Sequence, residues 1–328
     1  MVTISYHHSV NDLQGLAWEG CGPFGRPGWF ALLEGRGQTA CYALARSGET
    51  ALCLPLVDRE RTMAALTNWY AFTYAPLHTG AAADPVLAVA IARDLARRAA
   101  PVELAPLAAE DGTLALLQTA FRRAGWLTFA APCDANHVLP VEGRAFAQYL
   151  ASRPGPLRTT LKRKAAKVEV RLSTRFDAGD WAAYEAIYAA SWKPQEGDPA
   201  LLRAFAERES AAGHYRFALA LAGDEPVAAQ FWTVEDGTAY IHKLAHRQGA
   251  EALSPGTTLT AALLEQVIDR DRVGLVDFGT GDDRYKRDWM EAQRPRFRLV
   301  AYRPARPAHW PAIGRAAARA LVSRRGGG

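Results

Sequence analysis

The residues best suited to chemistry lie in one stretch, 254–289. Residues 254–258 (Ser-Pro-Gly-Thr-Thr) are typical of a helix start, with Ser254 as the N-cap and the proline in the first position. Such a start carries unpaired N–H groups and partial positive charge, so it could hold a phosphate, although an ordinary capped helix is the alternative. The stretch continues through an apolar strand to Asp277, two glycines and Lys286. An acid, a base and glycines at a strand end suit chemistry on a small polar group.

The surrounding sequence predicts the elements that position this stretch. Hydrophobic periodicity and turn residues give the order β-β-β-α-β-α-β. The predicted ranges are, in chain order, 216–222, 227–234, 238–244, 254–270, 273–278, 283–292 and 297–303. The first half of the chain repeats this order more weakly. Its predicted ranges are 38–46, 50–57, 62–72, 84–99, 102–107, 112–124 and 126–132.

The repeated order predicts an α/β protein built from two copies of one mixed α/β domain, at 1–150 and 171–305. A basic segment at 151–170 connects the copies, and its charges four residues apart favour a helix over 153–167. Residues 306–328 form a basic tail. The last 35 residues contain nine arginines and no Asp or Glu. Because the net charge of the whole chain is +5, the rest of the chain carries a net charge of 5 − 9 = −4.

Composition narrows the class of protein. With 328 residues, 49% of them hydrophobic and 22% charged, the chain is long enough for two packed domains. No apolar run approaches membrane-spanning length, and the first ten residues lack the pattern of a secretory signal. Four cysteines without metal-ligand spacing favour buried thiols in a reducing cytoplasm. The pair His7-His8 has no third ligand nearby, so a metal site is not expected.

The element order and the helix start resemble the GNAT acyltransferase superfamily. Residues 277–289 (Asp-Phe-Gly-Thr-Gly-Asp-Asp-Arg-Tyr-Lys-Arg-Asp-Trp) are similar to the DF-x-x-G-D-x-x-YK-x-x-W signature of the CelD-like (cellulose biosynthesis protein) acetyltransferases. These are relatives of the FemAB peptidyl transferases with two GNAT-like domains. Residues 191–193 (Ser-Trp-Lys) and 254–256 (Ser-Pro-Gly) also match that family. The resemblance implies tandem GNAT-like domains, acyl-CoA as the donor substrate and no metal.

One departure from the ordinary GNAT pattern concerns the cofactor loop. Residues 247–250 (Arg-Gln-Gly-Ala) begin a similar loop, but the stretch before the helix is longer and ends in Ser-Pro-Gly. This leaves the donor open among acyl-CoA, an acyl carrier protein and, as in FemAB proteins, a charged tRNA.

An amide-forming transfer needs a held donor, a group that takes the amine proton and a positive group or N–H donor for the oxyanion. Lys286 is the candidate for the oxyanion or a donor phosphate, with an ordinary surface lysine as the alternative. Asp277, as a desolvated carboxylate, or His242 is the candidate base; a turn-capping role and a structural role are their alternatives. With the resemblance, the expected donor-binding residues are Ser254, Gly256, Thr257 and Thr258.

Acceptor binding is expected from residues that flank these groups, namely Trp192, Lys193, Asp282 and Tyr285. Core packing is the alternative for Trp192, and shaping of the glycine-rich turn is the alternative for Asp282.

The segment 309–325 has the pattern of a helix that lies on an anionic membrane surface. Its apolar face consists of Trp310, Ile313, Ala317 and Leu321, and arginines lie largely elsewhere, at Arg315, Arg319, Arg324 and Arg325. A frayed basic tail is the alternative.

The sequence therefore predicts an N-acyltransferase that moves an acyl group from acyl-CoA to a primary amine by direct attack. The acceptor would be a small molecule or a lipid of the sphingoid type, or an envelope or polysaccharide precursor. One alternative is a FemAB-like transferase that uses aminoacyl-tRNA and binds RNA with residues 153–167. Apart from this alternative, nucleic acid is not an expected partner. Another is a non-catalytic accessory protein of polysaccharide synthesis. The expected location is cytoplasmic, with peripheral attachment to the inner face of the membrane as an option.

Overall fold

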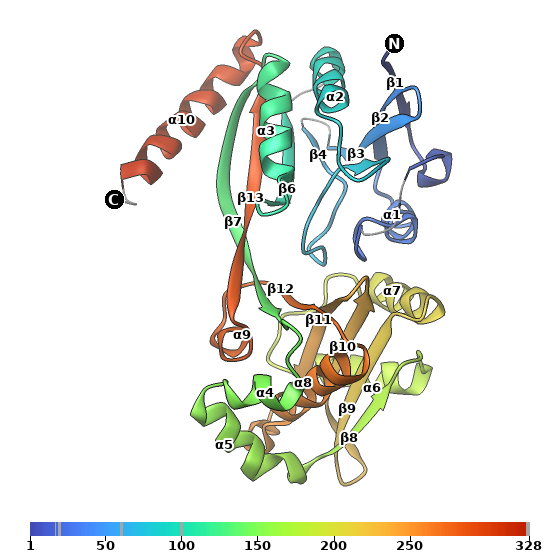
Figure 1. Ribbon diagram of the computed structural model, residues 1–328, viewed down its shortest axis with the longest axis vertical. Helices are drawn as coiled ribbons and strands as arrows, with labels where there is room; N and C mark the ends of the chain where they lie inside the picture. Colours follow the sequence, from blue (N-terminus) through green and yellow to red (C-terminus); the bar gives the residue numbers. More distant parts are fainter. Residues whose placement is uncertain (17, 19–20, 60–61, 99–100, 326–328) are drawn as a thin grey trace. The chain divides into compact units, whose positions relative to one another are not determined.

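The computed structural model describes residues 1–16, 18, 21–59, 62–98 and 101–325, the last helix beyond residue 319 by its backbone alone (Figure 1). The chain forms two compact units of mixed α/β structure, as predicted. The first consists of residues 1–135 and 294–328, and the second of residues 136–293. Strands β7 (Leu127–Pro140) and β13 (Ala292–Tyr302) both continue from one unit into the other.

This division differs from the expected boundaries at 150, 171 and 305. The last strand, β13, pairs with β6 (Val102–Ala108) of the first unit, with Ala301 opposite Val102. The end of β7 pairs with β12 (Leu275–Thr280) of the second unit, with Pro140 opposite Leu275. Hydrophobic periodicity identifies a strand but not the strand that it pairs with, so this exchange leaves no mark on the sequence pattern.

The first unit contains a mixed sheet with helices. Its other strands are β1 (Thr3–His7), β2 (Ala40–Ser47), β3 (Thr50–Asp58), β4 (Met63–Ala65) and β5 (Leu77–His78), and its helices are α1 (Pro27–Glu34), α2 (Pro85–Arg98), α3 (Thr113–Arg123) and α10 (Trp310–Arg325). The strand order is β1-β2-β3-β4-β6-β13-β7, with β5 beside β3. The hairpin about residue 48 is confirmed by the pairing of Ser47 with Thr50. The prediction of a strand over 62–72 is wrong beyond Ala65, where β4 ends.

The core of the first unit lies between this sheet and the neighbouring helices α2 and α3 (Figure 1). Leu87, Ile91 and Leu95 of α2 follow each other every fourth residue and are all fully buried, so they form the apolar face of this helix. Cys41 and Cys53 are buried as expected, whereas Cys133 is exposed because it lies on an exposed part of β7.

The second unit contains the sequence stretch with the candidate residues. Its strands are β8 (Glu169–Ser173), β9 (Tyr215–Ala222), β10 (Glu225–Glu235), β11 (Thr238–His246) and β12, and its helices are α4 (Phe146–Ala151), α5 (Gly155–Lys164), α6 (Ala178–Ala189), α7 (Pro199–Ala211), α8 (Pro255–Glu265) and α9 (Arg284–Trp289). The strand order is β7-β12-β11-β10-β9-β8. The predicted order β9-β10-β11-α8-β12-α9-β13 is confirmed. The helix expected to run to residue 270 ends with one π turn, Gln266–Arg270.

Helices cover both faces of this sheet. On one face, Trp232 and Ile241 belong to the same buried cluster as Leu259 and Leu263 of α8. On the other face, Phe231 packs against Trp181 of α6 and Phe205 of α7. Among the described helices of both units, none has the length and apolar character needed to cross a lipid bilayer.

Candidate active site

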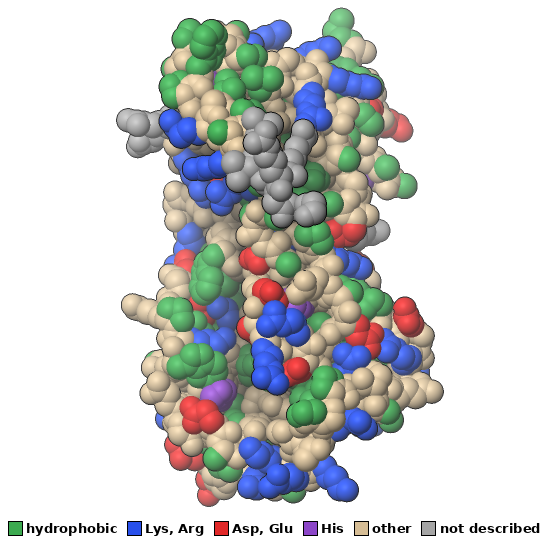
Figure 2. Space-filling view, turned by 90° about the vertical axis from the view of Figure 1, so that its left-hand side faces the viewer, with side chains coloured by type: hydrophobic (Ala, Val, Ile, Leu, Met, Phe, Trp, Pro, Cys, Tyr) green, Lys and Arg blue, Asp and Glu red, His purple; other side chains and the backbone are tan. Residues whose placement is uncertain are grey.

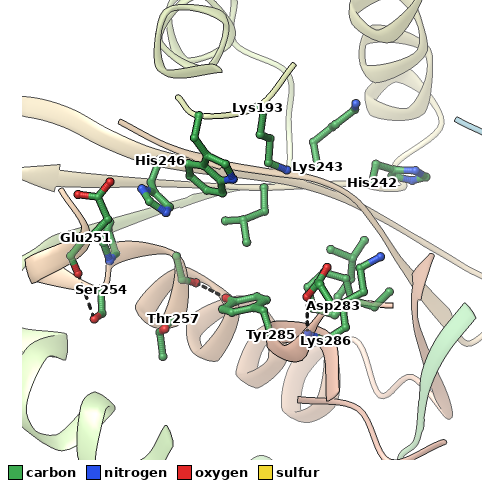
Figure 3. A pocket seen from close by; sticks show the side chains of 16 residues that line it. Lys193, His242, Lys243, His246, Glu251, Ser254, Thr257, Asp283, Tyr285 and Lys286 are labelled. Atoms are coloured by element: carbon green, nitrogen blue, oxygen red, sulfur yellow. Dashed lines mark hydrogen bonds between the residues drawn. The ribbon is translucent and has the colours of Figure 1, made fainter. Parts of the chain in front are cut away.

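A pocket opens where β11 and β12 separate. The two strands run parallel and pair from Thr238 opposite Leu275 to Tyr240 opposite Asp277. Both strands then continue, to His246 and Thr280, but no described residue beyond Tyr240 pairs with β12. The space between and beside them is a cavity of about 580 Å³. Its walls come from β11, the start of α8, α9 and the segment after α6 (Figure 3).

A β-bulge in β11 decides which side chains face this pocket. Trp232 lies opposite Ile241, and Phe231 lies opposite Lys243, so His242 is the extra residue. Ile241 therefore packs with Trp232 on the α8 face. Lys243 is on the same face of the sheet as Phe231, and its Nζ lies 5.5 Å from the centre of the ring of Tyr188 in α6. The bulge thus places two consecutive residues, His242 and Lys243, on the face that α6 and α7 cover.

The start of α8 forms one wall of the pocket, with residues 254–257 in the lining. Ser254 occupies the N-cap position as predicted, but its side chain makes no capping hydrogen bond. Its backbone is left-handed (φ 52°), and its hydroxyl accepts a hydrogen bond of 3.1 Å from Nζ of Lys164. The first N–H groups of a helix have no intrahelical acceptor, so this turn can bind an anion. A Cβ on Gly256 would lie 3.3 Å from Cδ1 of Leu244, so only glycine fits here without displacing its neighbour. Thr258 is buried outside the lining, and its hydroxyl donates to the Ser254 carbonyl.

A buried hydrogen-bond network fixes this first turn. The Gly256 carbonyl accepts from the amide of Gln230 at 3.1 Å and from the hydroxyl of Tyr285 at 2.9 Å. Thr260 bonds to both of these side chains, and the Trp232 indole donates to Oε1 of Gln230 at 2.8 Å. Burial raises the pKa of Tyr285, which therefore remains a donor. Sequence reasoning missed Gln230, although a polar residue inside an apolar strand was the available signal.

Lys286 lies in the same pocket as the start of α8, on α9. Asp283 caps this helix by accepting a hydrogen bond of 3.0 Å from the Lys286 N–H. The Lys286 ammonium donates to the Thr280 carbonyl and lies 5.4 Å from the centre of the Phe278 ring. The structure therefore brings Lys286, Tyr285 and residues 254–257 together around one cavity (Figure 3).

Asp277 and Asp282 lie outside the pocket lining. The Asp277 carboxylate is 5% exposed and accepts hydrogen bonds from Nδ2 of Asn136 at 3.0 Å and from the Gly279 N–H at 2.8 Å. It holds the left-handed turn at Gly279 (φ 66°) at the end of β12. Asp282 is exposed and contacts His137 and Arg287. This geometry supports the turn-capping alternative for Asp277 rather than a role as base.

Asp277→Ala is therefore expected to cost stability, because it leaves a buried amide and a buried N–H without their acceptor. Each such group costs about 1–3 kcal/mol when unsatisfied. Urea unfolding of the variant should show a lower free energy of unfolding with an unchanged slope. A variant as stable as the wild type that has lost only turnover would instead restore Asp277 as a catalytic base.

His242 lines the pocket but is poorly suited to proton transfer. Its Nε2 lies 2.7 Å from the Thr233 hydroxyl, and its ring packs 5.1 Å from the rings of Phe205 and Phe231. Burial, with a smaller contribution from the charge of Lys243, lowers the pKa of His242 to about 3. The imidazole is therefore neutral but a weak base at neutral pH.

Trp192, Lys193 and Lys243 line the pocket. Lys193 and Lys243 lie on the side of the pocket that faces α8 (Figure 3). Trp192 is 53% exposed, and its ring lies 4.2 Å from that of His246. Lys243 is buried in an ion pair of 2.9 Å with Glu196; burial lowers its pKa to about 8, although Glu196 opposes this shift. Lys243 and Glu196 were not predicted, because the bulge that turns Lys243 toward Glu196 has no signature in the sequence.

Helix α5 brings basic side chains close to the start of α8. The predicted helix over 153–167 is confirmed as α5 followed by a 3-10 turn, Ala165–Lys167. It packs beside α8, and Lys164 is its contact with Ser254. Figure 2 looks onto the side where α5 lies and shows several Lys and Arg side chains in its lower part.

Comparisons with known proteins agree with this architecture. Residues 156–287 match the model of the acetyltransferase (GNAT) domain family. No curated protein matches the sequence.

Three solved structures illustrate the fold of the whole chain. FemX is 11% identical with a TM-score of 0.62, over 87% of this chain and 92% of that chain. The C-terminal domain of a putative lysylphosphatidylglycerol synthetase from Agrobacterium fabrum is 13% identical with a TM-score of 0.54, and the match covers 83% of this chain and 86% of that chain. A tandem GNAT protein from the clavulanic acid biosynthesis pathway is 14% identical with a TM-score of 0.52, and the match covers 92% of this chain and 98% of that chain. The chain therefore has the fold of these tandem GNAT structures, and residues 156–287 are similar to the acetyltransferase (GNAT) domain family.

Proposed function

We propose that the protein is an N-acyltransferase that moves an acyl group from acyl-CoA to a primary amine by direct attack. One observation carries this proposal: a single cavity connects the first turn of α8 with Lys286 between two strands that separate. A helix start with unpaired N–H groups and a lysine in the wall of the same pocket suit a long donor that has a phosphorylated end and a reacting carbonyl.

Donor binding would use three features of the pocket. The N–H groups at Gly256 and Thr257 would bind donor phosphate, and the edge of β11 beyond Tyr240 offers backbone groups to the amides of the donor's arm. The thioester carbonyl would lie near Lys286, whose ammonium would stabilise the oxyanion as the amine attacks. Attack forms the C–N bond, breaks the C–S bond and releases the thiol.

The acceptor would enter past Trp192, whose exposed ring stands at the pocket wall. The signature at 277–289 supports a CelD-like enzyme that acts on an envelope or polysaccharide precursor or on a lipid amine. A lipid is favoured by α10: the Trp310 ring is 63% exposed, and Arg315 and Arg319 are exposed. The side chains of Leu321, Arg324 and Arg325, on which the expected amphipathic pattern also depends, lie outside the described residues.

Turnover tests the proposal. The full chain is incubated with acetyl-CoA or palmitoyl-CoA and with sphinganine or glucosamine, and free thiol is measured; sphinganine is presented in phosphatidylglycerol vesicles. We expect thiol release that requires an amine. No release from any donor with any amine would overturn the proposal.

An aminoacyl-tRNA donor is the second candidate, and the contact of Lys164 with Ser254 favours it, because this contact places the basic helix α5 beside the donor turn. Transfer from a charged tRNA, weakening steeply as salt rises, would support this candidate in place of acyl-CoA.

A further inference from the structure

Lysine is rare in this chain, and half of the lysines gather in the pocket. Lysine and arginine total 39, of which only six are lysine. Three of the six, Lys193, Lys243 and Lys286, line the cavity described above. The other 33 of the 39 basic residues are arginine. Lysine differs chemically because its amine can lose its proton in a protein, whereas a guanidinium cannot.

The three ammonium groups have different surroundings. Lys286 donates to the Thr280 carbonyl, and Lys243 is paired with Glu196. Within the part of the chain that the structure describes, the Lys193 Nζ has no hydrogen bond and no ion pair, and it lies 5.9 Å from the centre of the Trp192 ring. A half-buried amine in the pocket wall that makes no ion pair of its own is available to a substrate.

Lys193 also points to the place where an acceptor would meet the donor. It follows α6 and reaches into the cavity from the wall opposite Thr257 and Tyr285 (Figure 3). Its neighbour Trp192 provides the exposed edge of the same wall. Lys193 therefore faces the region between the donor turn and Lys286 from the side left open for the amine.

Burial and nearby carboxylates act on the pKa of Lys193 in opposite directions. Burial has the largest effect and lowers its pKa below the ordinary value, while Glu196 and Asp283 oppose the shift. The Glu196 carboxylate is engaged by Lys243, and the Asp283 carboxylate caps α9. On β11, Lys243 adds positive charge and His242 is neutral. A neutral form of Lys193 is thus easier to reach than that of an exposed lysine.

We propose that Lys193 is the catalytic residue that takes the proton from the attacking amine. This rests on the acyltransferase proposed above, and it fills the role for which neither Asp277 nor His242 is placed. As the C–N bond forms, the proton of the nitrogen moves to Nζ of Lys193. As the C–S bond breaks, Lys193 gives this proton to the departing sulfur, so that the products are an amide and a thiol and the lysine is neutral again.

Substitution by arginine separates this role from the binding of an anion. Lys193→Arg keeps a positive charge of similar reach but cannot accept a proton. We expect kcat to fall by about 10²-fold or more, with the KM for acyl-CoA little changed, since general-base catalysis contributes 10²–10⁴-fold. Wild-type kcat in Lys193→Arg, with a raised KM in Lys193→Ala, would overturn the proposal and leave Lys193 as an anion contact. Thermal unfolding of both variants checks that they fold.

Chemical rescue distinguishes a catalytic role of Lys193 from a structural one, because an added amine can replace a lost base but cannot replace a lost packing contact. Trimethylamine can accept a proton but cannot form a stable amide, so it should restore part of the turnover of Lys193→Ala and none of that of Lys193→Arg, whose side chain fills the space. Absence of rescue in Lys193→Ala, together with a wild-type pH profile, would count against the proposal.

Acetylation by acetic anhydride measures the basicity of Lys193 without turnover. Only neutral amines react, and mass spectrometry can follow all six lysines of the protein. The midpoint for Lys193 should lie at lower pH than those of exposed Lys162 and Lys167. An equal midpoint would overturn the proposal. A low midpoint in a protein that releases no thiol from any acyl-CoA would instead show that the proposed reaction is wrong.

Discussion

Lys286→Ala is expected to fold like the wild type and to lose about 10²- to 10³-fold in kcat, the range typical of removing one donor to an oxyanion. The Lys286 side chain is only partly buried, and its described bond goes to the Thr280 carbonyl at the end of β12. Truncating a partly buried side chain is expected to cost little stability. Because the ammonium would act on charge that develops in the transition state, kcat should fall while the KM for acyl-CoA changes little. Steady-state thiol release and thermal unfolding measure both properties.

The matched control is Arg287→Ala on the same helix. The Arg287 side chain is about half exposed and pairs with Asp282 outside the pocket. This variant also removes one positive charge from α9, and it should keep wild-type kcat. Equal losses in the two variants would mean that the charge of the helix matters and that the position of Lys286 does not. Wild-type turnover in Lys286→Ala would remove it from the mechanism.

Thr257→Glu is expected to change stability and donor binding in opposite directions. Thr257 occupies the third position of α8, where a carboxylate interacts favourably with the helix dipole by about 0.3–1 kcal/mol. The same negative charge would stand where donor phosphate binds, and about 1.4 kcal/mol of repulsion is enough for a tenfold loss of affinity. We expect Tm to stay the same or rise and the Kd of CoA to increase by about tenfold or more.

Thr257→Gln is the control for this substitution, since it has the same shape without the charge. Calorimetric titration with CoA should give the glutamine variant a Kd much closer to that of the wild type, and the difference should shrink as salt rises. If the glutamate and glutamine variants bind CoA equally well, the start of α8 does not hold the phosphates.

The second half of the fold could be predicted because its signals are local. The proline after Ser254 marks the start of α8, and alternating apolar residues mark β9, β10 and β11. The motif around Lys286 places α9 directly after a buried strand. Two elements of the second unit were not predicted. Every residue of β8 is partly or fully exposed, so no buried face marks this strand. Helix α7 has an apolar face that includes Leu201 and Phe205, and sequence reasoning missed this signal.

The parts of the site that sequence reasoning missed depend on distant residues. Asp277 was placed at the end of β12, but the residue that engages its carboxylate, Asn136, is 141 positions earlier in the chain. Gln230 holds the Gly256 carbonyl 26 positions later. Lys243 turns toward Glu196 because of a one-residue bulge, and such a shift changes the face of the sheet without changing the composition of the strand.

Binding of CoA in the pocket between β11 and β12 is tested most directly by thermal unfolding of the full chain with CoA, acetyl-CoA and palmitoyl-CoA, alongside Thr257→Glu. A ligand that binds only the folded state at about 100 times its Kd adds about 2.7 kcal/mol to stability. We predict a clear rise in the Tm of the wild type with each CoA species and a much smaller rise for Thr257→Glu at the same concentrations. No rise with any CoA species, or the same rise in both proteins, would contradict donor binding at this site.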